Sequence, residues 1–148
     1  MTLVFQTGTA TSCRTYVVDA CDPIVNTSIA TIPIDPDATW QIRQRDVLDF
    51  QVDWTQVLAT MGQSVTIASA TFTVPSTSPK TPQSVTGGFD PAGHTVFVLA
   101  PATAASVGDI YQVDVEITTT PSTLPAAPNV TVPARTLVRR VQIQVVPG

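Results

Sequence analysis

Acidic side chains recur at short intervals in RQRDVLDFQVDW, residues 43–54, where they alternate with large apolar groups. Paired carboxylates are the usual machinery of glycoside hydrolysis, so these acids are the first candidates for chemistry. Asp49 and Asp53 are four residues apart, which on a strand is too far for a close carboxylate pair unless the chain bends. The alternative is a strand whose acids face water while its apolar residues face a core.

Calcium binding is another interpretation of the acids, because calcium takes several oxygen ligands. The residues that could supply those ligands are Asp46, Asp49, Asp53, Asp109 and Asp114. The sequence contains no D-x-D-x-D-G loop. We therefore predict no metal site and leave calcium open as the alternative.

The single histidine, His94, lies in the segment PAGHTVF, where a turn is expected and the imidazole would be solvated. The sequence has no nucleophile-elbow motif, phosphate loop, dinucleotide fingerprint or HExxH. These observations predict no catalytic residue and no cofactor-binding residue, and they argue against an enzyme.

Cys13 and Cys21 are eight residues apart, with no CxxC motif and no histidine nearby, so their spacing does not suggest zinc. Two free thiols are the expectation in a reducing compartment, and a disulfide across the short loop is the alternative in an oxidising medium.

The one basic cluster is Arg135, Arg139 and Arg140, and the formal net charge of the chain is −4. Nucleic acid is therefore not expected as a partner, because phosphate binding needs a basic stripe. The arginines are better explained as a solvated strand face or a salt-bridge patch.

The composition favours strands and loops over helices. Only 12% of the 148 residues are charged, and 13 are prolines. The sequence has one glutamate, Glu116, and one lysine, Lys80. No apolar run approaches the ~20 residues of a membrane helix. The N-terminus lacks the basic start and apolar stretch of a signal peptide, so we expect no Sec export.

The acids are positioned by a strand of period two. Leu48, Phe50, Val52 and Trp54 fall on one face of residues 47–54, and the acids fall on the other. The next segment, residues 55–62, has the spacing of a short helix that ends at Gly62.

Alternation continues toward the C-terminus. Residues 64–74 change their apolar register midway, which predicts a bulge or a switch between sheets. The other strands are expected at 83–90 and 94–100, which form a hairpin around 91–93, and at 110–119 and 135–146. Loops are expected at 75–82, 101–109 and 120–134, the last being long and rich in proline.

Residues 1–38 differ from the rest, with short apolar runs among Thr, Pro and Asp. We expect an extended N-terminal arm with short strands near TLVFQT (2–7) and TYVVDA (15–20). Such an arm could lie on a neighbouring subunit or fold back on its own domain.

About six or seven strands joined by Pro- and Gly-containing loops over residues 39–148 predict an all-β domain. An immunoglobulin-like antiparallel β-sandwich with its apolar faces turned inward is the expected architecture. Trp40 or Trp54 is expected to anchor its core.

The segments DVLDFQVDWTQVLA, SVTIASATFTVP, GDIYQVDVEITT and RRVQIQV, within residues 46–146, resemble small immunoglobulin-like structural proteins of tailed bacteriophages. In that group an LDY-x-x-DW strand precedes a short helical turn, and an Arg-bearing strand comes last. Two features depart from the group: the N-terminal arm with its cysteines is extra, and the 120–134 loop is longer.

The resemblance implies a non-enzymatic virion component, an adaptor that joins tail or fibre components through its arm and loops. Its partners would be other virion structural proteins and further copies of itself, with no nucleic acid and no membrane. The expected location is the virion, assembled in the host cytoplasm. A capsid decoration protein and a carbohydrate-binding surface module are the alternatives.

Overall fold

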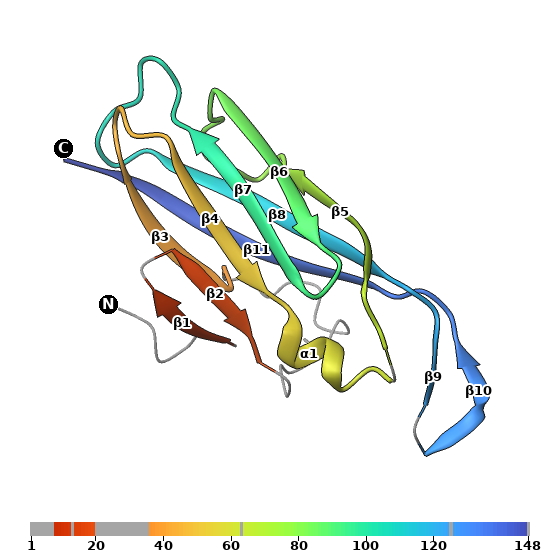
Figure 1. Cartoon of the computed structure of the whole chain (residues 1–148). Helices are drawn as coiled ribbons and strands as arrows, with labels where there is room; N and C mark the ends of the chain where they lie inside the picture. The colour runs from red at the N-terminus through yellow and green to blue at the C-terminus, as the bar shows by residue number, and fades with distance from the viewer. Residues whose placement is uncertain (1–7, 13, 20–35, 63, 125, 148) are drawn as a thin grey trace, which may run out of the picture.

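The computed structural model describes residues 8–12, 14–19, 36–62, 64–124 and 126–147, and these form an all-β structure with one short helix (Figure 1). A five-stranded sheet has the order β1 (Gly8–Ser12), β2 (Thr15–Val18), β4 (Leu48–Asp53), β7 (His94–Ala100), β6 (Ser84–Asp90). A four-stranded sheet has the order β3 (Ala38–Arg43), β11 (Thr136–Val146), β8 (Ile110–Thr119), β5 (Ile67–Thr73). The remaining elements are α1 (Thr55–Ala59) and a ribbon of β9 (Ser122–Leu124) and β10 (Ala127–Val132).

Most neighbouring strands are antiparallel, but two pairs are parallel, so the prediction of a wholly antiparallel arrangement is wrong on this point. β2 runs parallel to β4, and β3 runs parallel to β11. In both pairs the partners are far apart in the sequence and no tight turn joins them. Their relative direction is therefore not fixed by a hairpin.

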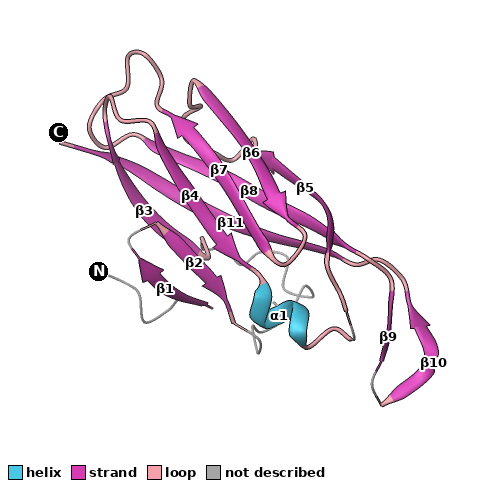
Figure 2. Ribbon diagram, viewed as in Figure 1, coloured by secondary structure: helices cyan, strands magenta, loops and turns pink. Residues whose placement is uncertain are grey.

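One hydrophobic core contains buried residues of both larger sheets. Figure 2 shows the strands of these sheets, with α1 following β4. The predicted alternation is confirmed: Phe50, Val52 and Trp54 are fully buried on one face of the β4 segment. Trp40 of the four-stranded sheet stacks on Phe50 of the five-stranded sheet, with ring centroids 5.0 Å apart. Both tryptophans are thus core residues, and burying each such side chain contributes about 2–3 kcal/mol.

The predicted helix is confirmed as α1, which buries Val57 and Leu58. It is followed by Gly62, whose φ of +136° is in the region that favours glycine. A Cβ at this position would lie 2.6 Å from the Thr123 carbonyl oxygen, so the chain needs glycine here for space as well. In the part of the chain that the structure describes, no helix is long and apolar enough to cross a membrane.

The predicted register change in residues 64–74 is confirmed as an irregularity in β5. Ile67 pairs with Thr119 and Ser69 with Thr118, so the extra residue Ala68 is bulged. The bulge lets Ile67 on one side and Ala70 and Phe72 on the other pack against the same core.

The prediction of a loop over residues 120–134 is wrong, because β9 and β10 form a two-stranded antiparallel ribbon there. Figure 1 shows the ribbon between the end of β8 and the start of β11, beyond the two sheets. Pro128 falls within the register shift between Ala127 and Thr131, where no ladder N–H is required. Pro128 is therefore compatible with the ribbon, although proline disfavours a regular ladder.

The N-terminal segment folds back on its own domain wherever the structure describes it. β2 lies inside the five-stranded sheet, and Tyr16 and Val18 are fully buried in the common core. This is the second of the two arrangements considered for residues 1–38. The strand expected at 2–7 and both cysteines, Cys13 and Cys21, lie outside the described residues.

Candidate functional site

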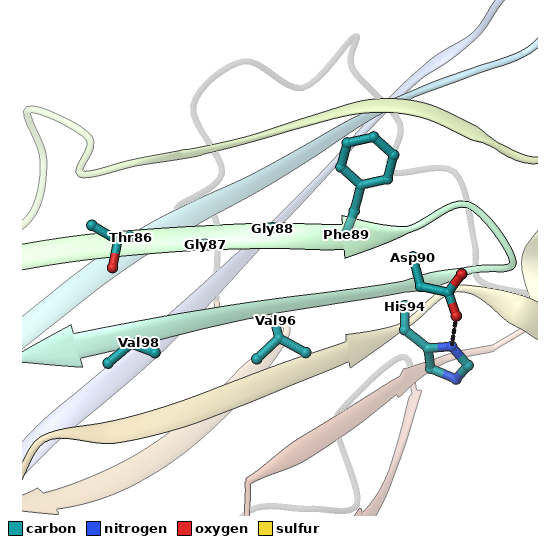
Figure 3. A pocket seen from close by; sticks show the side chains of 8 residues that line it. All are labelled: Thr86, Gly87, Gly88, Phe89, Asp90, His94, Val96 and Val98. Atoms are coloured by element: carbon teal, nitrogen blue, oxygen red, sulfur yellow. Dashed lines mark ion pairs between the residues drawn. The ribbon is translucent and has the colours of Figure 1, made fainter.

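Three ionisable side chains from three adjacent strands meet at one end of the five-stranded sheet. Asp53 ends β4, His94 begins β7 and Asp90 ends β6, and the ladders place both acids opposite His94. Nε2 of His94 lies 3.7 Å from Oδ2 of Asp53, and its Nδ1 lies 3.8 Å from Oδ2 of Asp90. The imidazole therefore has a carboxylate on each side, and Figure 3 shows the pair with Asp90.

A short turn brings Asp90 and His94 opposite each other. The amides of Ala92 and Gly93 donate to Oδ1 and to the backbone carbonyl of Asp90, at 3.1 and 3.0 Å. Gly93 has a φ of +136°, and a Cβ there would lie 2.8 Å from Cγ2 of Thr55. The predicted hairpin around residues 91–93 is thus confirmed, and its turn chemistry sets the geometry of the cluster.

The cluster is open and loosely bonded, which limits its chemistry. Both His94–carboxylate distances exceed hydrogen-bond length, and the His94 side chain is 36% exposed. Oδ1 of Asp53 already accepts the N–H and the hydroxyl of Thr55, at 2.9 and 2.7 Å. Asp53 therefore also stabilises the turn into α1. The cluster can form ion pairs when His94 is charged.

The Thr55 hydroxyl in the cluster donates to Asp53 and not to His94. No hydroxyl of the described residues makes a hydrogen bond with His94 there. No group of three or more His, Cys, Asp or Glu in the described ranges is arranged to hold a metal ion.

A shallow hollow of about 540 Å³ lies beside His94 on the hairpin of β6 and β7 (Figure 3). Its lining residues are Thr86, Gly87, Gly88, Phe89, Asp90, His94, Val96 and Val98. Gly87 is required by packing, because a Cβ there would lie 2.6 Å from the Phe72 ring. A Cβ on Gly88 would meet nothing within 4 Å, so the hollow above this residue is open.

No family model matches this sequence, and no curated protein matches it. The function must therefore be inferred from the sequence motifs, fold and surfaces of the chain itself.

The acids of residues 43–54 do not form one site. Asp49 is exposed and pairs with Arg14, whose Nη2 lies 3.7 Å from Oδ1 and whose Nε donates to the Asp49 carbonyl oxygen. Asp46 is in the turn after β3, with its amide donating to the carbonyl of Arg43. Of these three acids, only Asp53 belongs to the cluster with His94.

The remaining calcium candidates are also apart from the cluster. Oδ2 of Asp109 accepts the amide of Ser106 in the turn before β8. Asp114 is on the four-stranded sheet, where Arg140 binds both of its oxygens. The five acids considered for calcium are thus distributed over two sheets and two turns.

The three arginines near the C-terminus each have a structural contact. Arg140 donates from Nε and Nη2 to Asp114, at 2.7 and 3.0 Å. The hydrogen bond to Asp114 and the negative charges of Asp114 and Asp37 raise the pKa of Arg140, against the opposing effect of burial. This contact is the salt-bridge patch considered from the sequence.

The other two arginines contact residues on either side of α1. Arg139 places its guanidinium carbon 5.7 Å from the centroid of the buried Trp54 ring. Arg135 donates from Nη2 to the carbonyl oxygen of Met61, at 2.9 Å. Both contacts join β11 or the turn before it to the segment around the helix.

Asp90 is the member of the cluster that the sequence interpretation missed. The sequence predicts the hairpin and the place of His94 in it, but the prediction pairs no acid with the histidine. The signal was present, because a three-residue turn at 91–93 places residues 90 and 94 opposite each other.

Proposed function

We propose that this chain is a non-enzymatic structural component of a tailed-phage virion, an immunoglobulin-like adaptor that joins tail or fibre components. The observation that carries the proposal is the strand order of the two sheets, taken with the sequence motifs that resemble phage immunoglobulin-like proteins. The proposed docking elements are the loops, above all the ribbon of β9 and β10.

The strand order supports an immunoglobulin-like sandwich. Counted from β4, the successive strands β4 to β8 and then β11 take the places of strands B to G, while β3 lies beside the strand in the place of G. β4, β7 and β6 are then neighbours in the order B-E-D, and β5, β8 and β11 in the order C-F-G. β2 occupies the position beside B, and it runs parallel to that strand.

The ribbon supports binding because it is the connection between strands F and G, where sandwiches commonly carry a recognition loop. Its base is fixed by Ser122 Oγ and Arg135 Nη2, which both donate to the Met61 carbonyl oxygen at 3.3 and 2.9 Å. Beyond this base, Val130 is 44% exposed. A fixed base with exposed residues beyond it is suited to docking on another protein.

The placement of aromatic rings favours an adaptor over a carbohydrate-binding module. Sugar-binding modules usually present a flat row of exposed rings, but six aromatic residues here are buried: Tyr16, Trp40, Phe50, Trp54, Phe97 and Tyr111. Among the large apolar side chains that are exposed in the described part of the chain, Phe89 is the one ring.

Mass spectrometry of purified phage particles tests the proposal, with the expected result that the chain is present at a fixed copy number. Immunogold labelling then distinguishes an adaptor, at the tail or fibre junction, from a capsid decoration, over the head. Absence from purified particles would reject the virion role in either form.

A further inference from the structure

We propose that two copies of this chain associate through their β6 strands, edge to edge and antiparallel, so that the two five-stranded sheets join into one. This inference comes from the shape and charge of β6, and it holds or fails independently of the virion role.

β6 has the features of an open pairing edge. It is the last strand of its sheet and pairs with β7 alone among the described strands. Six of its seven residues are exposed, and the sequence SVTGGFD contains no Lys and no Pro. Edge strands are usually protected by such residues or by a bulge, and β6 pairs with β7 in an unbroken register.

The β5 and β3 edges of the four-stranded sheet are less suited to pairing. β5 is interrupted by its bulge between Ile67 and Ser69. β3 carries the exposed Arg43, and the exposed Arg45 follows it closely. β6 has one charge, Asp90, at its end.

Gly88 is the residue that the fold of a single copy does not explain. A glycine within a strand destabilises it relative to alanine, and Gly87 has a compensating reason in the Phe72 ring beneath it. Gly88 has no such neighbour within 4 Å. Glycine within a strand often marks a place where another chain approaches closely.

A second copy of β6 fits this edge when the two strands are antiparallel and centred on Gly87. Thr86 of each copy then lies opposite Gly88 of the other, where its side chain covers the open space. Phe89, which is 41% exposed, lies opposite the half-buried Val85 on the other face. Both contacts are favourable cross-strand pairs of a large with a small or apolar residue.

The charges also select this arrangement. Antiparallel pairing places Asp90 of each copy opposite Ser84 of the other, at opposite ends of the joined strands. Parallel pairing would bring the two Asp90 carboxylates together, which is unfavourable. The β6 edge therefore best fits a second copy of the chain, and the two copies form an antiparallel dimer with two-fold symmetry.

Sedimentation equilibrium of the full chain tests the dimer, with Thr86→Lys/Gly88→Lys as the disrupting variant. Both residues are exposed, and the four lysines of a dimer would lie together on one face, weakening dimerisation by at least about tenfold. The matched control is Thr39→Lys/Gln41→Lys on the β3 edge, which adds the same charge to exposed positions and should stay dimeric. A monomeric wild type at about 0.1 mM, or a β6 variant that dimerises like the control, would overturn the proposal.

Cross-linking tests the register even if the lysine variant fails to fold. Copies with Thr86→Cys are mixed with copies that carry Gly88→Cys, both in a Cys13→Ser/Cys21→Ser background, and then oxidised. Disulfide-linked heterodimers are expected, because directly opposed residues have suitable Cα separations. No cross-linking would overturn the register, and a Thr39→Cys with Gln41→Cys mixture controls for random collision.

Discussion

The indole Nε1 of Trp54 donates a hydrogen bond to Oγ1 of Thr95 at 3.0 Å, and both residues are fully buried between the sheets. Trp54 follows β4 directly and Thr95 is on β7, so the bond joins neighbouring strands inside the core. Thr95 in turn approaches the Val52 carbonyl oxygen at 3.4 Å. A large aromatic side chain is therefore buried without leaving its polar N–H unsatisfied.

Thr95→Val should destabilise the protein by about 1–3 kcal/mol, because it keeps the shape of the side chain and removes the acceptor of the buried indole N–H. Urea unfolding followed by tryptophan fluorescence measures the change. Thr39→Val, at an exposed position of β3, is the control and should change stability by less than about 0.5 kcal/mol. Equal stabilities of the two variants would contradict the assigned hydrogen bond.

Gly87→Ala and Gly88→Ala should have opposite effects although they are neighbours. A Cβ on Gly87 would lie 2.6 Å from the Phe72 ring and 2.7 Å from the Val96 carbonyl oxygen, so a loss of about 1–3 kcal/mol is expected. A Cβ on Gly88 meets open space, and reduced chain entropy should stabilise by up to about 1 kcal/mol. Thermal unfolding at low protein concentration checks both changes, and a destabilising Gly88→Ala would contradict this packing.

Arg140→Gln should destabilise the protein by about 1–2 kcal/mol, because the bidentate contact with Asp114 is lost while both side chains are 80% covered. Arg45→Gln, at an exposed position, is the control for the loss of charge.

The pH dependence of this pair follows from the direction of the arginine shift. The pKa of Arg140 is raised, so its contribution is fully present below the ordinary pKa of arginine and is lost only as the pH rises through the higher value. The difference in unfolding free energy between wild type and Arg140→Gln should therefore be constant from about pH 6 to pH 9. A difference that disappears within this range would contradict the assignment.

His94→Ala should change stability by less than about 1 kcal/mol, because the ion pairs of this histidine are long and exposed. Incorporation into particles should be unchanged, as measured by mass spectrometry of particles that carry the variant. Asp53→Ala is the informative comparison: it also removes the acceptor of two Thr55 hydrogen bonds and should be more destabilising. Loss of a measurable activity on His94→Ala would contradict the non-enzymatic proposal.

Strands with one buried face could be predicted from the sequence, because burial imposes a period of two on their residues. β8 is the clearest case, with Tyr111, Val113, Val115 and Ile117 all fully buried. β3 was not predicted as a strand of its own, although Trp40 and Ile42 alternate with exposed residues. A strand of six residues that lies close to several prolines shows only a weak alternation in the sequence.

Contacts between distant segments could not be predicted, since register across a sheet is not encoded locally. The alignment of Asp53 with His94 depends on a pairing of β4 with β7 over some forty residues. The insertion of β2 beside β4 is of the same kind. A chain lacking residues 1–38 is therefore expected to lose stability, because Tyr16 and Val18 of β2 are fully buried.

Replacing residues 122–132 by a short Gly-containing turn should separate folding from docking. The ribbon pairs with itself and contributes none of the buried core residues, so the circular-dichroism spectrum should stay that of an all-β protein. Stability should fall by about 1–2 kcal/mol, because Ser122 no longer donates to the Met61 carbonyl. Incorporation into particles should be lost if the ribbon is a docking element. Ser122→Ala, which removes the same hydrogen bond and keeps the ribbon, is the control for stability and should still be incorporated. Normal incorporation of the shortened chain would assign docking to other surfaces.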